Sequence, residues 1–259
     1  MNEKKEAKRL LSMAILAGKI MLENGAETYR VEDTITRICT ARKFVNYAEP
    51  FVIPTGIFMS IGYNDEIITY IQRTKTKKID LNKITLVNEF SRQFVNTDIT
   101  IDEAFQLLHE IDSTKAYPRS VNLLFGGFAG GFFSILFGGT FLDFISAFFV
   151  SVLVIETKQF LEKYNIMYFI NNFVGAFVAT VFAILFTNIG IGNSMDTIII
   201  GSIMPLVPGV AITNATRDSI LGDFLSGISR GMEAIIVALS IAFGVGLTLR
   251  LYFLYFGGM

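Results

Sequence analysis

The stretch MPLVPGVAITNATRDSILGDFLSGISRGME, residues 204–233, decides how the rest of the chain is interpreted. It begins in an apolar run long enough to enter a bilayer. Pro205 and Pro208 then remove two backbone donors and open the helical hydrogen-bond ladder. In lipid, the freed carbonyl groups must be satisfied by protein or by a water-filled cavity. The pattern therefore predicts a broken membrane helix at a polar, membrane-embedded site.

A charged segment follows the two prolines, and charges so close to an apolar run are costly unless they face one another or a polar pathway. If the chain is helical from residue 216 into the next apolar run, one face about 100° wide carries Thr216, Ser219, Asp223, Ser226, Arg230 and Glu233. We expect this face and the broken helix to line a path for a small polar metabolite, formed by Pro208, Gly209, Thr213, Asn214, Arg217, Asp218, Asp223, Ser226, Arg230 and Glu233.

Three of these charged residues have expected roles. The planar fork of Arg230 suits a substrate carboxylate, because it can bind two oxygens at once. Glu233 or Asp223 could hold an ammonium group or carry a proton. The alternative is an arginine–acid network that only seals the loop and takes no part in transport.

Composition places the chain among membrane proteins. Hydrophobic residues make up 52% of it and the mean hydropathy is +0.51. A net charge of −1 argues against a nucleic-acid partner. A single cysteine, Cys39, excludes an internal disulfide and is expected to be a packed helix residue. With the single His109 it leaves no His/Cys metal cluster, so we expect no metal and no cofactor.

Residues 1–116 are predicted to form a small cytosolic α/β domain. Helical periodicity over residues 3–23 and in the segment after Gly25 predicts two helices. Two β-rich runs around Tyr63-Asn64-Asp65-Glu66 predict a hairpin, with Pro50 and Pro54 placing its first strand at an edge. Two amphipathic helices follow, over 81–95 and 100–112, the second beginning at a capping box on Thr100.

Residues 117–259 are predicted to form an α-helical multi-span membrane domain. We expect five spans, near 121–138, 140–157, 166–188, 197–214 and 232–254. Basic residues flank the first span and occupy the loops after the second and the fourth. By the positive-inside rule, the N-terminal domain is cytoplasmic and the C-terminus lies outside a multi-pass cell-membrane protein.

The segment GAETYRVEDT, residues 25–34, is a second polar motif, with Glu27, Tyr29, Arg30, Glu32 and Asp33 as its candidate residues. Arg30 lies three residues from an acid on either side and can pair with either one. One interpretation is a surface ion-pair lattice worth tenths of a kcal/mol. The other is an acidic docking or gating face.

These two motifs also carry a resemblance. GAETYRVEDT and the pattern P-x-x-P-G…TNATRD…GD…SG..RG.EA over 205–234 resemble motifs of the threonine/serine exporter family, in matching order over nearly the whole chain. Full-length members have more spans than this chain. It therefore resembles the larger subunit of the family's split form, which implies a small multi-span membrane partner and opens a dicarboxylate such as succinate as substrate.

Three functions remain as expectations. The first is an efflux subunit for small polar metabolites, driven by a proton or ion gradient because no nucleotide-binding loop is present. The second is a membrane-anchored hydrolase using Glu27, Glu32 and Asp33, although no nucleophile–base pair supports it. The third is a non-transporting scaffold or sensor. The lipid bilayer is a partner in all three, and assembly with further copies of the chain is left open.

Overall fold

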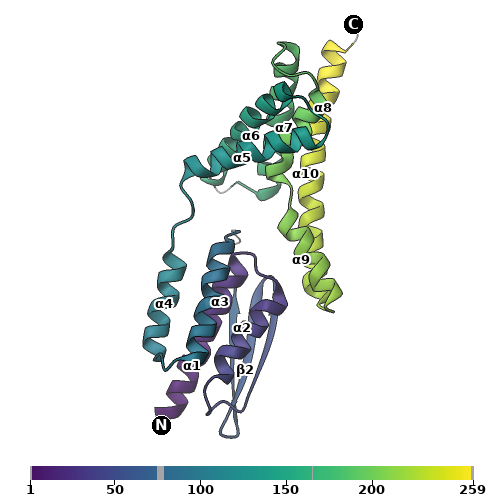
Figure 1. The fold of residues 1–259 in the computed structure, drawn as a ribbon. Coiled ribbons are helices and arrows are strands. Elements are labelled where there is room, and N and C mark those ends of the chain that lie inside the picture. Colours follow the sequence, from purple (N-terminus) through teal and green to yellow (C-terminus); the bar gives the residue numbers. More distant parts are fainter. Residues whose placement is uncertain (1, 75–78, 165, 258–259) are drawn as a thin grey trace. The chain divides into compact units, whose positions relative to one another are not determined.

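The computed structural model describes residues 2–74, 79–164 and 166–257 (Figure 1). The chain divides into two compact units. The first unit comprises residues 1–116 together with 210–231, and the second comprises 117–209 together with 232–259. The charged segment of the deciding stretch therefore packs with the N-terminal residues.

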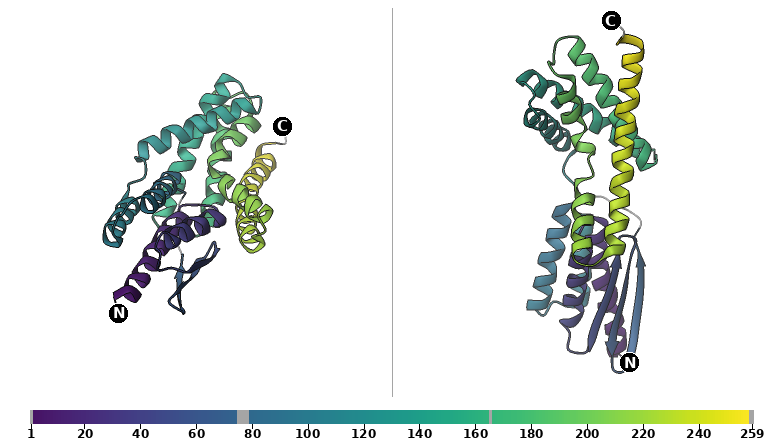
Figure 2. Two further views of the ribbon diagram at one scale, coloured as in Figure 1. Left: turned by 60° about the horizontal axis from the view of Figure 1, so that its bottom comes forward. Right: turned by 90° about the vertical axis from the view of Figure 1, so that its right-hand side faces the viewer.

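The first unit is a three-stranded antiparallel sheet covered on one face by helices (Figures 1 and 2). The strands are β1 (Tyr47–Ile53), β2 (Gly56–Tyr63) and β3 (Glu66–Arg73), in the order β1-β2-β3. Helices α1 (Asn2–Glu23) and α2 (Thr28–Thr40) contact the sheet, and α3 (Leu81–Asn96) and α4 (Ile101–Ser113) pack against them. The predicted order of two helices, a β-hairpin and two helices is confirmed, with one strand added.

The hairpin is the predicted one. Tyr63 pairs with Glu66, and the two turn residues Asn64 and Asp65 have φ of 41° and 61°. Positive φ at both central positions is the type I′ geometry that matches the twist of the flanking strands. Pro50 lies on the edge strand β1, but the first strand of the hairpin is β2, the central strand, so the expectation that this strand lies at an edge is wrong.

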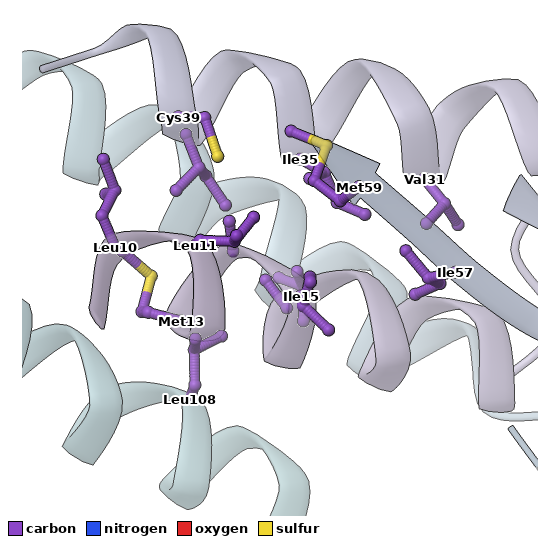
Figure 3. Close-up of a cluster of buried hydrophobic side chains, with 14 of the residues drawn as sticks. Leu10, Leu11, Met13, Ile15, Val31, Ile35, Cys39, Ile57, Met59 and Leu108 are labelled. Carbon is purple, nitrogen blue, oxygen red and sulfur yellow. The ribbon is translucent and has the colours of Figure 1, made fainter. Parts of the chain in front are cut away.

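The core of the first unit lies between α1, α2 and the inner face of the sheet. Figure 3 shows Leu11 and Ile15 of α1 near Ile35 of α2 and Ile57 of β2. Cys39 is fully buried in the same cluster, as predicted, and burial raises the pKa of its thiol to about 12. The only cysteine of the chain is therefore inert while this core is closed.

The second unit is helical. Its elements are α5 (Arg119–Leu136), α6 (Phe141–Glu162), α7 (Tyr168–Asn188), α8 (Met195–Ile203) and the short 3-10 helix η1 (Met204–Leu206). Two helices are shared between the units by their residue ranges, namely α9 (Gly209–Ile220) and α10 (Phe224–Phe256). The interruption predicted at Pro205 and Pro208 is present, because η1 and a non-helical Val207 separate α8 from α9.

Among the described residues, three helices are long and apolar enough to cross a membrane, namely α5, α7 and α10. The interrupted pair Met195–Leu206 and Gly209–Ile220 makes a fourth if it counts as one broken span. Five spans are not confirmed. The predicted second span corresponds to α6, in which the apolar residues between Asp143 and Glu156 would cover only about 18 Å of a hydrocarbon core of roughly 30 Å.

The start of α6 is held by a buried carboxylate. Asp143 is fully buried, and its Oδ2 accepts hydrogen bonds from the Thr140 backbone N–H (2.7 Å) and Oγ1 (2.8 Å) in a capping box. Its Oδ1 accepts from the backbone N–H groups of Asn193 (2.7 Å) and Ser194 (2.9 Å). Asp143 thus ties the start of α6 to the loop between α7 and α8.

Candidate functional site

The two polar motifs meet within the first unit, at the start of α2. The backbone oxygen of Gly25 accepts a hydrogen bond from Asn214 Nδ2 at 2.9 Å. The neighbouring oxygen of Ala26 accepts one from Arg230 Nη2 at 2.8 Å. The two side chains lie 189 and 204 residues further along the chain. They satisfy backbone carbonyl groups just before α2 that would otherwise bind water or a local side chain.

A buried ion pair lies at the centre of this junction. Arg230 Nε is 3.1 Å from Asp218 Oδ2, and the two side chains are 9% and 0% exposed. Asp218 Oδ2 also accepts from Thr28 Oγ1 at 3.3 Å. Thr28 opens α2, and the N-cap residue Glu27 makes no side-chain cap of its own. The Asp218 carboxylate therefore stands at the positive end of α2, supplied by a distant helix.

The pair forms because the chain turns back between α9 and α10. Gly222 has φ of 94°, a conformation that favours glycine, and α10 starts two residues later at Phe224. Figure 2 shows the two helices side by side after this turn. The expectation of one continuous helix from residue 216 into the last apolar run is therefore wrong. The polar residues occupy two faces of a helical hairpin.

Glu27 makes the outer contacts of the junction. Its carboxylate pairs with Arg30 at 3.1 Å within α2 and with Arg217 of α9. Both guanidinium groups are more than one-third exposed, so each pair contributes at most about 1 kcal/mol. The predicted Arg30–Glu27 pair is confirmed, whereas Asp33 pairs with Arg37. Glu27 belongs both to an ion-pair lattice and to a contact with the second motif.

An apolar groove adjoins these outer contacts. Tyr29 of α2 and Thr213 of α9 line it, and its volume is about 680 Å³. The other lining side chains are those of Ile212, Thr216, Arg217, Ile220 and Leu221. The groove brings one residue of each predicted motif to one surface.

Glu32 places a third acid near the junction. Its Oε1 accepts a hydrogen bond from the backbone N–H of Val52 at 2.9 Å. Burial, and then the negative charges of Asp223 and Asp218, raise the pKa of Glu32 above its ordinary value of about 4.5, against the lowering effect of that hydrogen bond. Within the described part of the chain, no three His, Cys, Asp or Glu side chains are placed to hold a metal ion.

This raised pKa predicts a pH-dependent stability. Between the unfolded and the folded pKa the folded state binds more protons, so the stability of the first unit should fall as pH rises through that window. Glu32→Gln removes the titration and keeps an acceptor for Val52. The melting temperature of wild type relative to Glu32→Gln should therefore drop as pH increases from 4.5. Circular dichroism melts of both proteins across this range measure it, and parallel curves would contradict it.

The remaining predicted residues divide between the units. Ser226 is buried in the first turn of α10, and Asp223 lies in the turn before it, both in the first unit. Pro208, Gly209 and Glu233 belong to the second unit. There, Glu233 is close enough to the Tyr168 phenol to act on it electrostatically. The structure therefore places seven of the ten predicted path residues in the first unit, and four of them contact the start of α2, namely Asn214, Arg217, Asp218 and Arg230.

The sequence interpretation missed three participants. Gly25 and Ala26 contribute backbone oxygens, which have no side-chain signature. Thr28 contributes a hydroxyl. A signal for Thr28 was available, since a threonine at a helix start commonly bonds to a carboxylate or to backbone near that end.

Comparison with known proteins identifies the family. The family model described as "Putative threonine/serine exporter" matches residues 12–252. The chain is 22% identical over 246 residues to the "Probable threonine/serine exporter" of Mycobacterium tuberculosis, covering 94% of this chain and 46% of that protein. It is 24% identical over 250 residues to the "Threonine/serine exporter" of Corynebacterium glutamicum, covering 93% and 51%. The chain thus spans about half the length of these two relatives.

A third relative matches end to end. The "Probable succinate transporter subunit YjjP" of Klebsiella aerogenes is 23% identical over 251 residues, covering 96% of each protein. No solved structure matches the chain. The matched family is one of transporters and not of enzymes, which removes the basis for the hydrolase alternative. With a family match over most of its length and apolar helices that can cross a bilayer, this chain belongs to the threonine/serine exporter family of membrane transport proteins.

Proposed function

We propose that the chain is a subunit of a membrane exporter that moves small polar metabolites out of the cytoplasm. The substrate classes are threonine/serine-type amino acids or a dicarboxylate such as succinate, after the names of the relatives. A small multi-span membrane protein of the same family completes the exporter. This proposal draws on the end-to-end match to a protein named as a subunit and on the half-length match to the full exporters.

The proposed topology follows from charge. Of 22 Lys and Arg residues, 17 precede residue 120, and the later ones are Lys158, Lys163, Arg217, Arg230 and Arg250. We place residues 1–116 in the cytoplasm on this basis. With α6 and the interrupted α8–α9 pair counted as spans, the chain crosses the membrane five times and its C-terminus lies outside.

One observation carries the assignment of the site, namely the buried Arg230–Asp218 pair at the start of α2. A buried pair contributes little net stability over well-packed apolar side chains, so stability alone does not account for this one. Arg230 is already bound to Asp218 and Ala26 within the first unit. We therefore assign Arg230 to holding the junction closed, and the acids Asp223 and Glu233 to the solute or to a coupled proton.

Export measurements test this assignment. Asp223→Asn and Glu233→Gln should each lower efflux of the exported metabolite at least tenfold, because the amide keeps the shape but loses the charge. The protein level in membranes should stay unchanged. Asp102→Asn, which removes an exposed carboxylate paired with Arg9 on the first unit, is the matched control and should export normally.

The assay needs cells that lack this chain, complemented with each variant together with the proposed small multi-span partner, and loaded with serine, threonine or succinate. Wild-type efflux in both variants would contradict the assignment of the two acids. Wild-type efflux in cells with no copy of the chain would sink the exporter itself.

A further inference from the structure

Two buried hydroxyl groups in the second unit stand apart from the others there. Ser151 of α6 and Ser202 of α8 are fully buried, and their Oγ atoms have no hydrogen-bond partner among the described residues. Buried hydroxyls elsewhere in this unit donate to the backbone, as Ser134, Thr180, Ser240 and Thr248 do at 2.7–2.9 Å. A buried hydroxyl left without a partner costs about 1–3 kcal/mol, so a pair of them calls for an explanation.

Both hydroxyls belong to the place where α5, α6 and α8 meet. A Cβ added to Gly130 of α5 would lie 1.8 Å from Ser151 Oγ and 3.1 Å from the backbone oxygen of Gly201. Ser151 Oγ therefore occupies the place that a side chain at residue 130 would take, and the Gly201 oxygen lies beside that place.

Helix geometry places Ser202 of α8 at the same height along the bundle as Ser151 of α6. Ile198 of α8 lies beside Ser146 of α6, since both are near a Cβ added to Gly192. Ser202 is one turn further along the same face of α8, and Val150 is one turn further along α6. Ser151 follows Val150, so the two hydroxyls lie at the same height in the bundle.

The electrostatics of this place favour a cation. Gly201 and Ser202 lie in the last turn of α8, which holds no basic residue, and the carboxyl end of a helix carries about half a negative charge. The Met204 N–H donates to the Gly201 oxygen and leaves one lone pair of it, and Pro205, which follows, cannot supply a further backbone donor. The atoms available are neutral oxygens only, the ligands that interrupted membrane helices offer to sodium in other transporters.

We propose that Ser151 Oγ, Ser202 Oγ and the Gly201 backbone oxygen form a binding site for a sodium-sized monovalent cation. Binding would satisfy both hydroxyls as acceptors and would use the negative end of α8. The use of this ion to drive solute movement rests on the proposed function, whereas its binding does not.

Equilibrium binding of radioactive sodium to the purified full chain in detergent tests the site. Wild type should show saturable binding that unlabelled sodium chloride displaces and choline chloride does not. Ser151→Ala and Ser202→Ala should each weaken the apparent affinity at least tenfold. Ser240→Ala is the matched control, because it removes a buried hydroxyl of the same unit that already has a partner, and it should bind like wild type.

Gly130→Ala gives a second, independent variant. Its methyl group would push the Ser151 hydroxyl aside without removing an oxygen, so it should also weaken sodium binding at least tenfold. A circular dichroism melt in choline chloride shows that each variant is folded. Absence of saturable sodium binding in wild type would overturn the proposal, as would wild-type affinity in Ser151→Ala and Ser202→Ala.

Sodium binding by the purified chain, set beside the efflux of complemented cells, separates the two proposals. Sodium binding by a protein that exports none of the tested metabolites would contradict the exporter and leave the ion site standing. Export by a protein that binds no sodium would overturn the ion site alone.

Discussion

Arg230→Met should destabilise the first unit by about 3–5 kcal/mol, because it leaves the fully buried Asp218 carboxylate without its counter-charge. The same change frees the Ala26 backbone oxygen from its hydrogen bond. Cys39 supplies the measurement, since it is the only cysteine and is buried in the core of this unit. Its labelling by a maleimide dye under native conditions should speed up by at least a hundredfold.

Two further variants separate a lost ion pair from a lost side chain. In the double variant Arg230→Met with Asp218→Asn no charge remains buried, so labelling should return most of the way to the wild-type rate. Arg30→Met removes a partly exposed arginine that pairs with Glu27, and it should change labelling by less than about fivefold. If Arg230→Met and Arg30→Met label alike, the buried pair does not hold the junction.

Asp143→Ala should be the most damaging single change in the second unit. It strands the backbone N–H groups of Thr140, Asn193 and Ser194, which all donate to this carboxylate. Hydrogen bonds to a charged acceptor are worth about 1.5–3 kcal/mol each, and all three end on a carboxylate that is fully buried. We expect a loss of at least about 3 kcal/mol.

Unfolding in increasing sodium dodecyl sulfate, followed by circular dichroism, measures this loss. The matched control is Asp196→Ala, which removes an acid from the first turn of α8 and should cost at most about 1 kcal/mol through the helix dipole. Equal midpoints for the two variants would show that Asp143 is not the tie between α6 and the loop before α8.

Local patterns in the sequence were sufficient for the four helices and the hairpin of residues 1–116. The residues Tyr63 to Glu66 specify their own turn, and Thr100 with Glu103 forms the predicted capping box. The prediction treated residues of β1 and β2 as one strand of the hairpin. Two prolines reduce the β character of β1, and the turn at Pro54-Thr55 that separates it from β2 was not recognised.

The sequence could indicate which charged residues need a partner, but it could not indicate which atoms those partners are. A charge next to an apolar run must be compensated, and this rule placed Asp218 and Arg230 among the candidate residues. The prediction placed both residues on one helix because it assumed that the helix continues without a break from residue 216 into the last apolar run. The helix-stop signal at Gly222 was in the sequence, and with it the two side chains fall on facing helices. The carbonyl oxygens that complete the junction carry no sequence signal at all.

The contact between Arg230 and Ala26 joins positions 204 residues apart in the chain. During synthesis, the amino-terminal helices and sheet leave the ribosome long before their last supporting segment has been translated. Loop-closure entropy rises only slowly with length, so the late arrival of α9 is thermodynamically tolerable. Until then, the start of α2 lacks its caps, and a nascent chain arrested before residue 210 should be markedly more sensitive to protease there than the finished protein.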